Sequence, residues 1–167
     1  MGCTVVESIC LLIGENKPYG LDLTKFCTNY FAEGEYYALT ERVRPREIED
    51  GGKGPNGFEY EVTTAGQTGS REPIWPTTIA ATVTSGSVTF TCRAISNSSL
   101  TKTISSSTWS VPTGITADDD STVTSNGEQK TAVFLEATAA VTKEGITNTV
   151  TFSDGHVEEF VLRVSAS

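Results

Sequence analysis

The chain has 167 residues, a formal net charge of −9 and a sequence pI of about 4.6. This charge argues against a nucleic-acid partner, because a phosphate backbone is bound by clustered Lys and Arg. No apolar run approaches the ~18–20 residues that a membrane-spanning helix needs. The length suits one medium domain or two small ones, and we expect neither nucleic-acid nor membrane binding.

The N-terminal segment, residues 4–13, is an apolar run that contains the β-branched residues Val5 and Ile9. Its length and composition favour a short strand, or an arm that docks on a neighbouring protein, over a helix. Val5 and Ile9 are therefore candidate contact residues. Because no basic region precedes this run and Glu7 interrupts it, we expect a mature N-terminus without a signal peptide.

One short helix is predicted after Asp22, whose carboxylate can accept the free N–H groups of a first helical turn. Gly34 is placed to end this helix in the left-handed conformation that follows many helices. Between these two residues, apolar side chains recur on one helical face: Leu23, Phe26, Cys27, Tyr30 and Phe31.

Two strands are predicted next, at residues 36–44 and 58–63. Pro45 ends the first strand, because proline cannot donate to a strand ladder. The charged, glycine-rich residues 46–56 between the strands form a loop. The second strand alternates an apolar and a polar face, with Phe58, Tyr60 and Val62 inward and Glu59, Glu61 and Thr63 outward.

A loop with Gly66 and Gly69, both free to take positive φ, leads into the sequence EPIWP. Prolines on both sides of Trp75 fix its backbone and predict a buried anchor, because Trp buries a large area on few torsions. A second interpretation places Trp75 on an exposed surface that stacks on sugars, together with Tyr36, Tyr37 and Tyr60. Ser85-Gly86 then forms the turn of a hairpin over residues 82–91.

The C-terminal part follows a polar linker at residues 93–102 and reads as a small β-sandwich. An acidic loop is expected at residues 117–129. A tight hairpin turn at 153–156 joins the last two strands, because Asp-Gly favours such turns. The strands of this part are expected at residues 103–111, 131–137, 146–152 and 157–164. Alternation along the last two places one set of side chains inward: Ile146, Val150, Phe152, Phe160, Leu162 and Val164.

The candidate chemical groups do not form a catalytic, cofactor or metal site in the sequence. The one histidine, His156, falls on the predicted hairpin turn, where a positioned general base is not expected. Residues 118–120 are consecutive aspartates that lack the spacing of a calcium loop. The four cysteines lack metal-ligand spacing, and both free thiols and disulfides remain open for Cys3, Cys10, Cys27 and Cys92.

The run YYALTERVRP…NGFEYEVTTAGQTGSREPIWPTTIAATVTSGSVTFTC resembles a small module that recurs in structural proteins of tailed bacteriophages. The chain departs from that pattern at Thr40 in place of Gly, Ser85 in place of Asp and Phe90 in place of Trp. The matching positions are Pro45, Asn56, Gly57, Tyr60, Gly66, Gly69, Glu72, Pro73, Trp75 and Pro76.

A second resemblance covers TISSSTWSVPTGIT and ITNTVTFSDGHVEEFVLRV, which look like the C-terminal immunoglobulin-like module of phage fibre–tail adaptor and neck proteins. The positions that carry it are Trp109, Pro112, Gly114, Asn148, Asp154 and Gly155. Together the two motifs span about residues 36–165. The resemblance implies a mainly β chain with an arm and short helix at 1–35, a small β-module at 36–95 and an immunoglobulin-like β-sandwich at 103–167.

The function that this resemblance implies is that of a virion structural protein, assembled in the host cytoplasm, with no enzymatic activity and no cofactor. A neck or fibre–tail adaptor is expected, which contacts connector, tail, fibre or capsid proteins in several symmetric copies. Trp75 and Tyr60 would anchor its loops, and residues 4–13, 46–56 and 64–72 would make contacts. The alternatives are a capsid decoration protein and a carbohydrate-binding module that contacts host glycans through Trp75.

Overall fold

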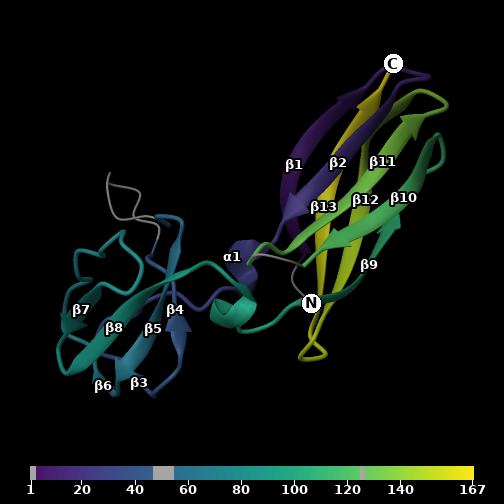
Figure 1. The fold of residues 1–167 in the computed structure, drawn as a ribbon. Helices are drawn as coiled ribbons and strands as arrows, with labels where there is room; N and C mark the ends of the chain where they lie inside the picture. The colour runs from purple at the N-terminus through teal and green to yellow at the C-terminus, as the bar shows by residue number, and fades with distance from the viewer. Residues whose placement is uncertain (1–2, 47–54, 125–126) are drawn as a thin grey trace. The chain divides into compact units, whose positions relative to one another are not determined.

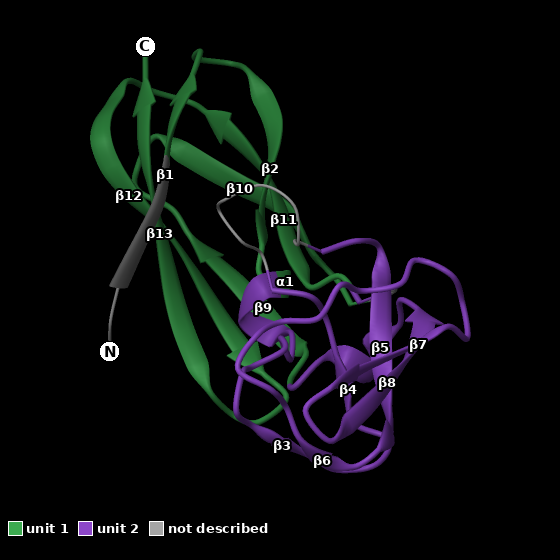
Figure 2. Cartoon of the chain, turned by 90° about the vertical axis from the view of Figure 1, so that its left-hand side faces the viewer, with its two compact units in different colours: residues 1–24, 102–124, 128–167 green, residues 25–101, 125–127 purple. Residues whose placement is uncertain are grey.

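The structure is a computed structural model that describes residues 3–46, 55–124 and 127–167. Strands make up 57% of it and helices 5%, so the predicted mainly β fold is confirmed. The chain forms two compact units, each with its own core (Figures 1 and 2). Unit 1 consists of residues 1–24, 102–124 and 128–167, and unit 2 of residues 25–101 and 125–127.

Unit 1 contains two sheets, with strand orders β1-β13-β12-β9 and β10-β11-β2. Strand β1 pairs in parallel with β13, and the other pairs of both sheets are antiparallel. The strands are β1 (Cys3–Leu11), β2 (Asn16–Asp22), β9 (Ile104–Ser110), β10 (Ile115–Val123), β11 (Lys130–Ala137), β12 (Val141–Phe152) and β13 (Val157–Ala166).

The two sheets of unit 1 lie as two layers, as Figure 1 shows, and the core lies between them. Alternate side chains point inward because successive residues of a strand face opposite sides. The hydroxyl of Thr131 on β11 donates to Asn148 Oδ1 on β12 across the layers, at 3.2 Å. The immunoglobulin-like fold stays a prediction. The buried side chains include the six predicted ones, Ile146, Val150, Phe152, Phe160, Leu162 and Val164.

Unit 2 contains a four-stranded antiparallel sheet in the order β4-β5-β8-β7 and a two-stranded sheet of β3 and β6. Helix α1 (Thr24–Cys27) spans the boundary of the units in sequence. Among the described residues, no helix has the length and apolar character to cross a membrane. The remaining elements are β3 (Tyr36–Tyr37), β4 (Arg42–Val43), β5 (Phe58–Thr64), β6 (Gly66–Gln67), β7 (Thr82–Ser85), β8 (Val88–Ala94) and a 3-10 helix (Asn97–Ser99).

The core of unit 2 is rich in aromatic side chains. Trp75 packs edge-on against Phe31 and Phe90, with ring centroids 5.6 and 5.3 Å away. Phe90 in turn meets Tyr37 at 5.8 Å. Such edge-to-face pairs add to the stabilisation that burial of the rings provides. The other buried members of this core are Val43, Tyr60, Val62, Val88 and Cys92.

The predicted N-terminal region 1–35 requires correction, because the structure places residues 1–24 in unit 1. Strand β1 is a paired strand and not a free arm: its residues from Cys3 to Leu11 pair along β13. Ile9 is only 6% exposed and Leu11 only 2%, so both lie in the core of unit 1. A paired edge strand and a docking arm show the same apolar pattern in the sequence. Only the observed pairing of β1 with β13 distinguishes them.

The predicted helix is also much shorter than expected. Asp22 Oδ1 accepts the Thr24 N–H at 3.0 Å, as an N-cap should, but α1 ends at Cys27. Beyond it, the N–H groups of Asn29 and Phe31 donate to distant backbone carbonyls. A short isolated helix is marginal, so these long-range backbone pairs replace its later turns. Phe26, predicted to face the core, is 55% exposed as a result.

Two further predictions differ from the structure. The acidic residues expected in a loop at 117–129 belong largely to strand β10, which pairs with β11 around a bulge. The strand expected at 36–44 is split into β3 and β4 by a turn in which Thr40 has a φ of 71°. The loop predicted at 46–56 lies mostly outside the described residues, since the structure leaves out 47–54.

Candidate functional site

Trp75 is the anchor of the EPIWP loop in unit 2. Its side chain is 8% exposed, and its ring lies 4.3 Å from that of Tyr60 between centroids. The indole Nε1 donates to Glu72 Oε1 at 2.7 Å, and the same carboxylate oxygen accepts the N–H of Arg46 at 2.9 Å. The indole ring is therefore buried and its N–H is hydrogen-bonded, so Trp75 fixes the loop to the core.

Tyr60 holds the chain directly after Trp75. It is fully buried, and its hydroxyl donates to the carbonyl of Pro76 at 2.8 Å while it accepts from Asn56 Nδ2 at 2.6 Å. Burial raises the pKa of Tyr60 to about 12, so the hydroxyl remains a donor across the physiological range. Both predicted anchor residues of this unit therefore act on the same short segment.

The loop that precedes EPIWP is pinned by hydrogen bonds and by close backbone contacts. Thr68 Oγ1 donates to the carbonyl of Ala32 at 2.8 Å and accepts the Glu35 N–H at 3.0 Å. Gly66 and Gly69 are free to take positive φ, but neither residue adopts it. Gly66 is instead required by close approach, since a Cβ there would lie 2.3 Å from Ser87 Oγ.

Next to the buried Trp75, the same loop exposes an apolar side chain. Ile74 is 84% exposed, the highest value among the large apolar residues that the structure describes as exposed. Elsewhere in unit 2, Tyr36 and Leu39 are exposed at 69% and 58%. Single exposed apolar residues are common on protein surfaces. What distinguishes Ile74 is its position beside an anchored indole, on a loop that is held in place.

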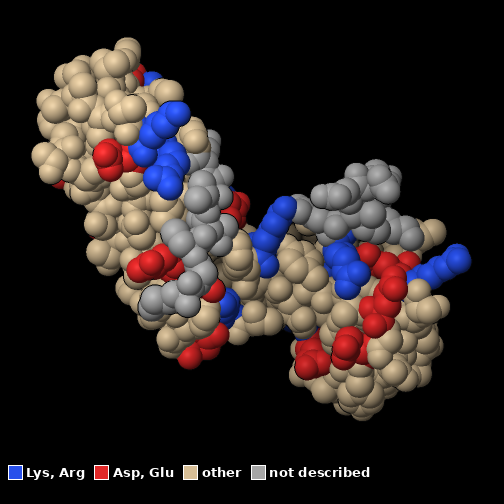
Figure 3. All heavy atoms as spheres, turned by 180° about the vertical axis from the view of Figure 1, so that it is seen from behind, with Lys and Arg blue, Asp and Glu red and all other residues tan. Residues whose placement is uncertain are grey.

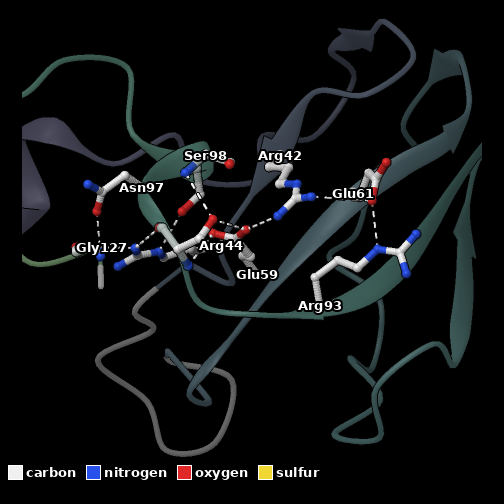
Figure 4. A network of polar contacts seen from close by, with 10 residues as sticks. Arg42, Arg44, Glu59, Glu61, Arg93, Asn97, Ser98 and Gly127 are labelled. Atoms are coloured by element: carbon white, nitrogen blue, oxygen red, sulfur yellow. Dashed lines mark hydrogen bonds and ion pairs between the residues drawn. The ribbon is translucent and has the colours of Figure 1, made fainter. Parts of the chain in front are cut away.

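A polar network supports the sheet of unit 2 (Figure 4). Its centre is Glu59, which is fully buried, although alternation along the strand predicted an outward side chain. Its carboxylate pairs with Arg42 Nη1 and accepts the N–H and hydroxyl of Ser96 at 3.0 and 2.7 Å. On the outer part of the network, Glu61 pairs with Arg93 Nε at 2.6 Å.

The protonation of Glu59 follows from these contacts. Burial by itself would raise its pKa, but the hydrogen bonds from Ser96 and Arg42 outweigh burial and lower the pKa below its ordinary value. Glu59 is therefore a charged, fully hydrogen-bonded carboxylate at neutral pH. This arrangement fixes structure and does not leave a carboxylate free to exchange protons with a substrate.

Arg44 is a second buried member of the same network and is 6% exposed. Its guanidinium donates to Ser99 Oγ at 2.8 Å and to the carbonyls of Ser96 and Gly127 at 3.3 and 3.2 Å. It thereby ties three segments that are distant in sequence. The stretch predicted as a simple polar linker, 93–102, thus supplies partners to both buried charges.

Of the residues predicted for contacts in the N-terminal segment, Ile9 faces the core of unit 1 and is not an exposed contact residue. The side chain of Val5 lies outside the described residues, as does that of Cys3. Of the other three cysteines, Cys10 is an exposed free thiol, Cys92 is a buried free thiol, and Cys27 is buried. Burial raises the pKa of the Cys92 thiol, which makes it less reactive.

The remaining chemical candidates do not converge on a reaction site. His156 is half exposed on its turn, with Nε2 2.8 Å from Glu158 Oε1. Asp118, Asp119 and Asp120 are all exposed on β10. Within the part of the chain that the structure describes, no three His, Cys, Asp or Glu side chains are grouped to hold a metal ion.

Comparisons with family models, with curated proteins and with solved structures found no match to this chain.

Proposed function

We propose that this chain is a structural protein of a tailed-bacteriophage virion, of the neck or fibre–tail adaptor kind, and that it acts through protein–protein contacts without catalysis. The observation that carries the proposal is the burial of Trp75, which anchors a motif typical of such proteins. The two β units would present fixed loops to neighbouring virion proteins, and the chain would be assembled into the particle in the host cytoplasm.

The carbohydrate-binding alternative required an exposed Trp75, and Trp75 is buried. A sugar ring stacks on an exposed aromatic face, whereas Trp75 is 8% exposed and is covered by Phe31, Tyr60 and Phe90. Tyr60 is fully buried and Tyr37 is 6% exposed, so two of the three tyrosines are covered as well. Tyr36 alone does not form a stacking surface with them.

The contact in this proposal is made by the loop that Trp75 holds down. Ile74 is exposed on a segment whose backbone is fixed by Glu72, Trp75 and Tyr60, so its position is defined before a partner binds. A pre-ordered apolar contact loses less conformational freedom on binding than a mobile one. This supports a connector that meets its neighbours with loops already in place.

Two measurements test the proposal. Mass spectrometry and antibody-gold imaging of purified phage particles should find the protein in the particle, and at the junction of head, tail or fibre. Ile74→Asp should leave the protein folded by circular dichroism and reduce its incorporation, while Thr77→Asp, an exposed position on the same segment, should be incorporated normally. A protein absent from purified particles would contradict the function itself.

A further inference from the structure

Unit 1 carries a basic hollow of about 390 Å³ on the outer face of its four-stranded sheet. Ser8 and Arg163 are cross-strand partners, as are Cys10 and Ser165, so these side chains share one face. Lys143 completes the basic side, and its N–H donates to Ser165 Oγ at 3.1 Å. The lining residues are Ser8, Ile9, Cys10, Lys143, Arg163 and Ser165.

The positive charges of this hollow are unusual in a chain with a net charge of −9. Arg163 and Lys143 are exposed and make no ion pair with a carboxylate that the structure describes; Arg163 Nη1 instead lies 3.4 Å from the carbonyl of Lys143. The exposed Glu144 beside them is not paired with either. The other basic side chains of unit 1 are engaged: Lys17 with Glu15, Lys130 with Glu128, and Lys102 over the ring of Phe152.

Figure 3 shows Lys and Arg atoms side by side on one face of unit 1, with acidic atoms close by. The hollow therefore offers an incoming group two cations, Lys143 and Arg163, that have no carboxylate partner among the described residues. Carboxylates are the protein groups that form the strongest hydrogen bonds with guanidinium and ammonium. An acidic protein segment is the occupant that this chemistry selects.

Such a segment is present on the same unit, at strand β10. Asp118, Asp119 and Asp120 are exposed, and the last two lie in a bulge without a cross-strand partner on β11. Asp118 is paired with Phe134, so the two side chains lie on one face, and Phe134 is 41% exposed. The surface thus combines negative charge with an exposed aromatic ring.

The basic hollow and the acidic segment lie at different edges of unit 1. Strand β1 is the outermost strand of one sheet, next to the hollow, and β10 is the outermost strand of the other. Strand β10 contacts β9, at the opposite end of the first sheet from β1. One copy cannot pair its own two surfaces, whereas two copies can, head to tail.

We propose that copies of this chain associate through these two surfaces, with Asp118–Asp120 and Phe134 of one copy in the basic hollow of the next. The inference rests on the proposed function, which calls for several copies in a particle. A contact between two different surfaces continues from copy to copy and closes into a ring when its rotation allows. The ion pairs at this contact give it specificity, and salt weakens it.

Sedimentation and light scattering of the full chain test this contact. The wild type should self-associate in a concentration-dependent way, and more weakly at high salt. The double variants K143E/R163E and D118K/D120K should each associate at least about tenfold more weakly, because each brings like charges together. Arg71→Glu and Glu33→Lys reverse exposed charges of unit 2 and should associate as the wild type does.

Mixing separates this contact from non-specific charge effects. Equal amounts of K143E/R163E and D118K/D120K should restore assembly, because each altered surface then meets a complementary one. In Asp120→Cys, mild oxidation should link Cys10 of one copy to the new thiol of another, as read by mass spectrometry of the linked peptides. Cys10→Ser should abolish that link.

A wild-type chain that stays monomeric, folded double variants that associate normally, or a mixture that fails to recover each overturns the inference. So does a thiol link that forms only between two copies of Cys10. Protein that is found in purified particles and is nevertheless monomeric in solution overturns this contact and leaves the proposed function standing. Absence from particles contradicts the function, whatever the solution result.

Discussion

The two units of this chain are stabilised by different kinds of interaction. Unit 1 has strands of 7–12 residues and a core made mostly of aliphatic side chains, held by regular pairing. Unit 2 has four strands of two to four residues among its six, and joins them by an aromatic cluster and buried charges. Its loops are therefore held by individual side chains more than by strand ladders.

The two tryptophans make this difference concrete. Trp75 in unit 2 donates its Nε1–H to Glu72 at 2.7 Å. Trp109 in unit 1 is 9% exposed, and its Nε1 is buried without a hydrogen-bond partner among the described residues. Trp75 organises a loop through a specific polar contact, whereas Trp109 is buried in unit 1 without such a contact among the described residues. Single changes should accordingly have local effects in unit 1 and loop-wide effects in unit 2.

Deletion of residues 1–11 should have the largest effect, and it should fall on unit 1. Ile9 and Leu11 are buried, and losing such side chains costs about 2–5 kcal/mol each. Their sum approaches the total stability of a small domain, about 5–15 kcal/mol. Hydrogen exchange should show lost protection in β12 and β13, measured by mass spectrometry.

Adjacent leucines give the matched control for that deletion. Leu11 is 2% exposed and Leu12 63%. Leu11→Ala should therefore lower the free energy of unfolding by about 2–5 kcal/mol, whereas Leu12→Ala should change it by less than about 0.5 kcal/mol. Full protection of unit 1 after the deletion would mean that β1 is a docking arm after all.

Trp75→Ala should be the most damaging single change in unit 2. Removing a buried Trp costs about 3–5 kcal/mol, and here it also frees Glu72 and the EPIWP backbone. The neighbouring change Ile74→Ala should cost less than about 0.5 kcal/mol, since Ile74 is 84% exposed. Urea unfolding, followed by hydrogen exchange at β5 and β8, measures both. Equal effects at the two positions would refute the anchor role.

Glu59→Gln should destabilise unit 2 by about 3 kcal/mol, because Arg42 loses its buried carboxylate partner and keeps only Glu61, whose Oε2 lies 3.5 Å from Arg42 Nη2. This is the low end for breaking a buried pair, since the Arg42 side chain remains 25% exposed. Glu61→Gln, on the same strand but partly exposed, should cost about 1 kcal/mol or less. Urea unfolding of both variants provides the comparison.

The pH dependence gives the same residue a second test. The pKa of Glu59 is lower in the folded state than its ordinary value of 4.5. The ionised carboxylate therefore contributes fully to the free energy of unfolding above pH 4.5, and this contribution is lost as the pH falls through the pKa of the folded state. Wild-type unit 2 should therefore lose stability below about pH 4.5, and Glu59→Gln should lose less over that range. Parallel curves for the two proteins would show that Glu59 is not a source of the pH dependence.

Sequence reasoning succeeded where the pattern was local. Alternation located the inward faces of β12 and β13, and Ser85-Gly86 and Asp154-Gly155 marked turns in which both glycines have positive φ. It also gave Trp75 as a buried anchor. These features depend on residues within a few positions of one another.

It failed where distant segments decide the outcome. Glu59 and Glu61 occupy similar positions in the sequence, yet Glu59 is covered by Ser96 and Arg42, more than ten residues away on either side. The later turns of the predicted helix were replaced by pairs to distant carbonyls. The acidic stretch became strand β10 because β11 offered a partner. No local signal carries such information.

Thr40→Gly should produce the smallest effect and the opposite sign. Thr40 has a φ of 71°, a left-handed conformation that costs a residue with a Cβ about 1–2 kcal/mol. Glycine would remove that strain and lose about 0.5–1 kcal/mol through its greater freedom when unfolded, so unit 2 should gain up to about 1 kcal/mol.

Thr64→Gly is the control for this gain, because Thr64 lies in the extended strand β5. At this position no backbone strain is relieved, and glycine only adds conformational freedom to the unfolded chain. The free energy of unfolding of Thr64→Gly should therefore fall by about 0.5–1 kcal/mol. Thermal unfolding of the two variants side by side gives the sign directly. If Thr40→Gly also destabilised the protein, contacts of the Thr40 side chain would have to outweigh the strain of its positive φ. Side-chain interactions would then stabilise this turn of unit 2 as well.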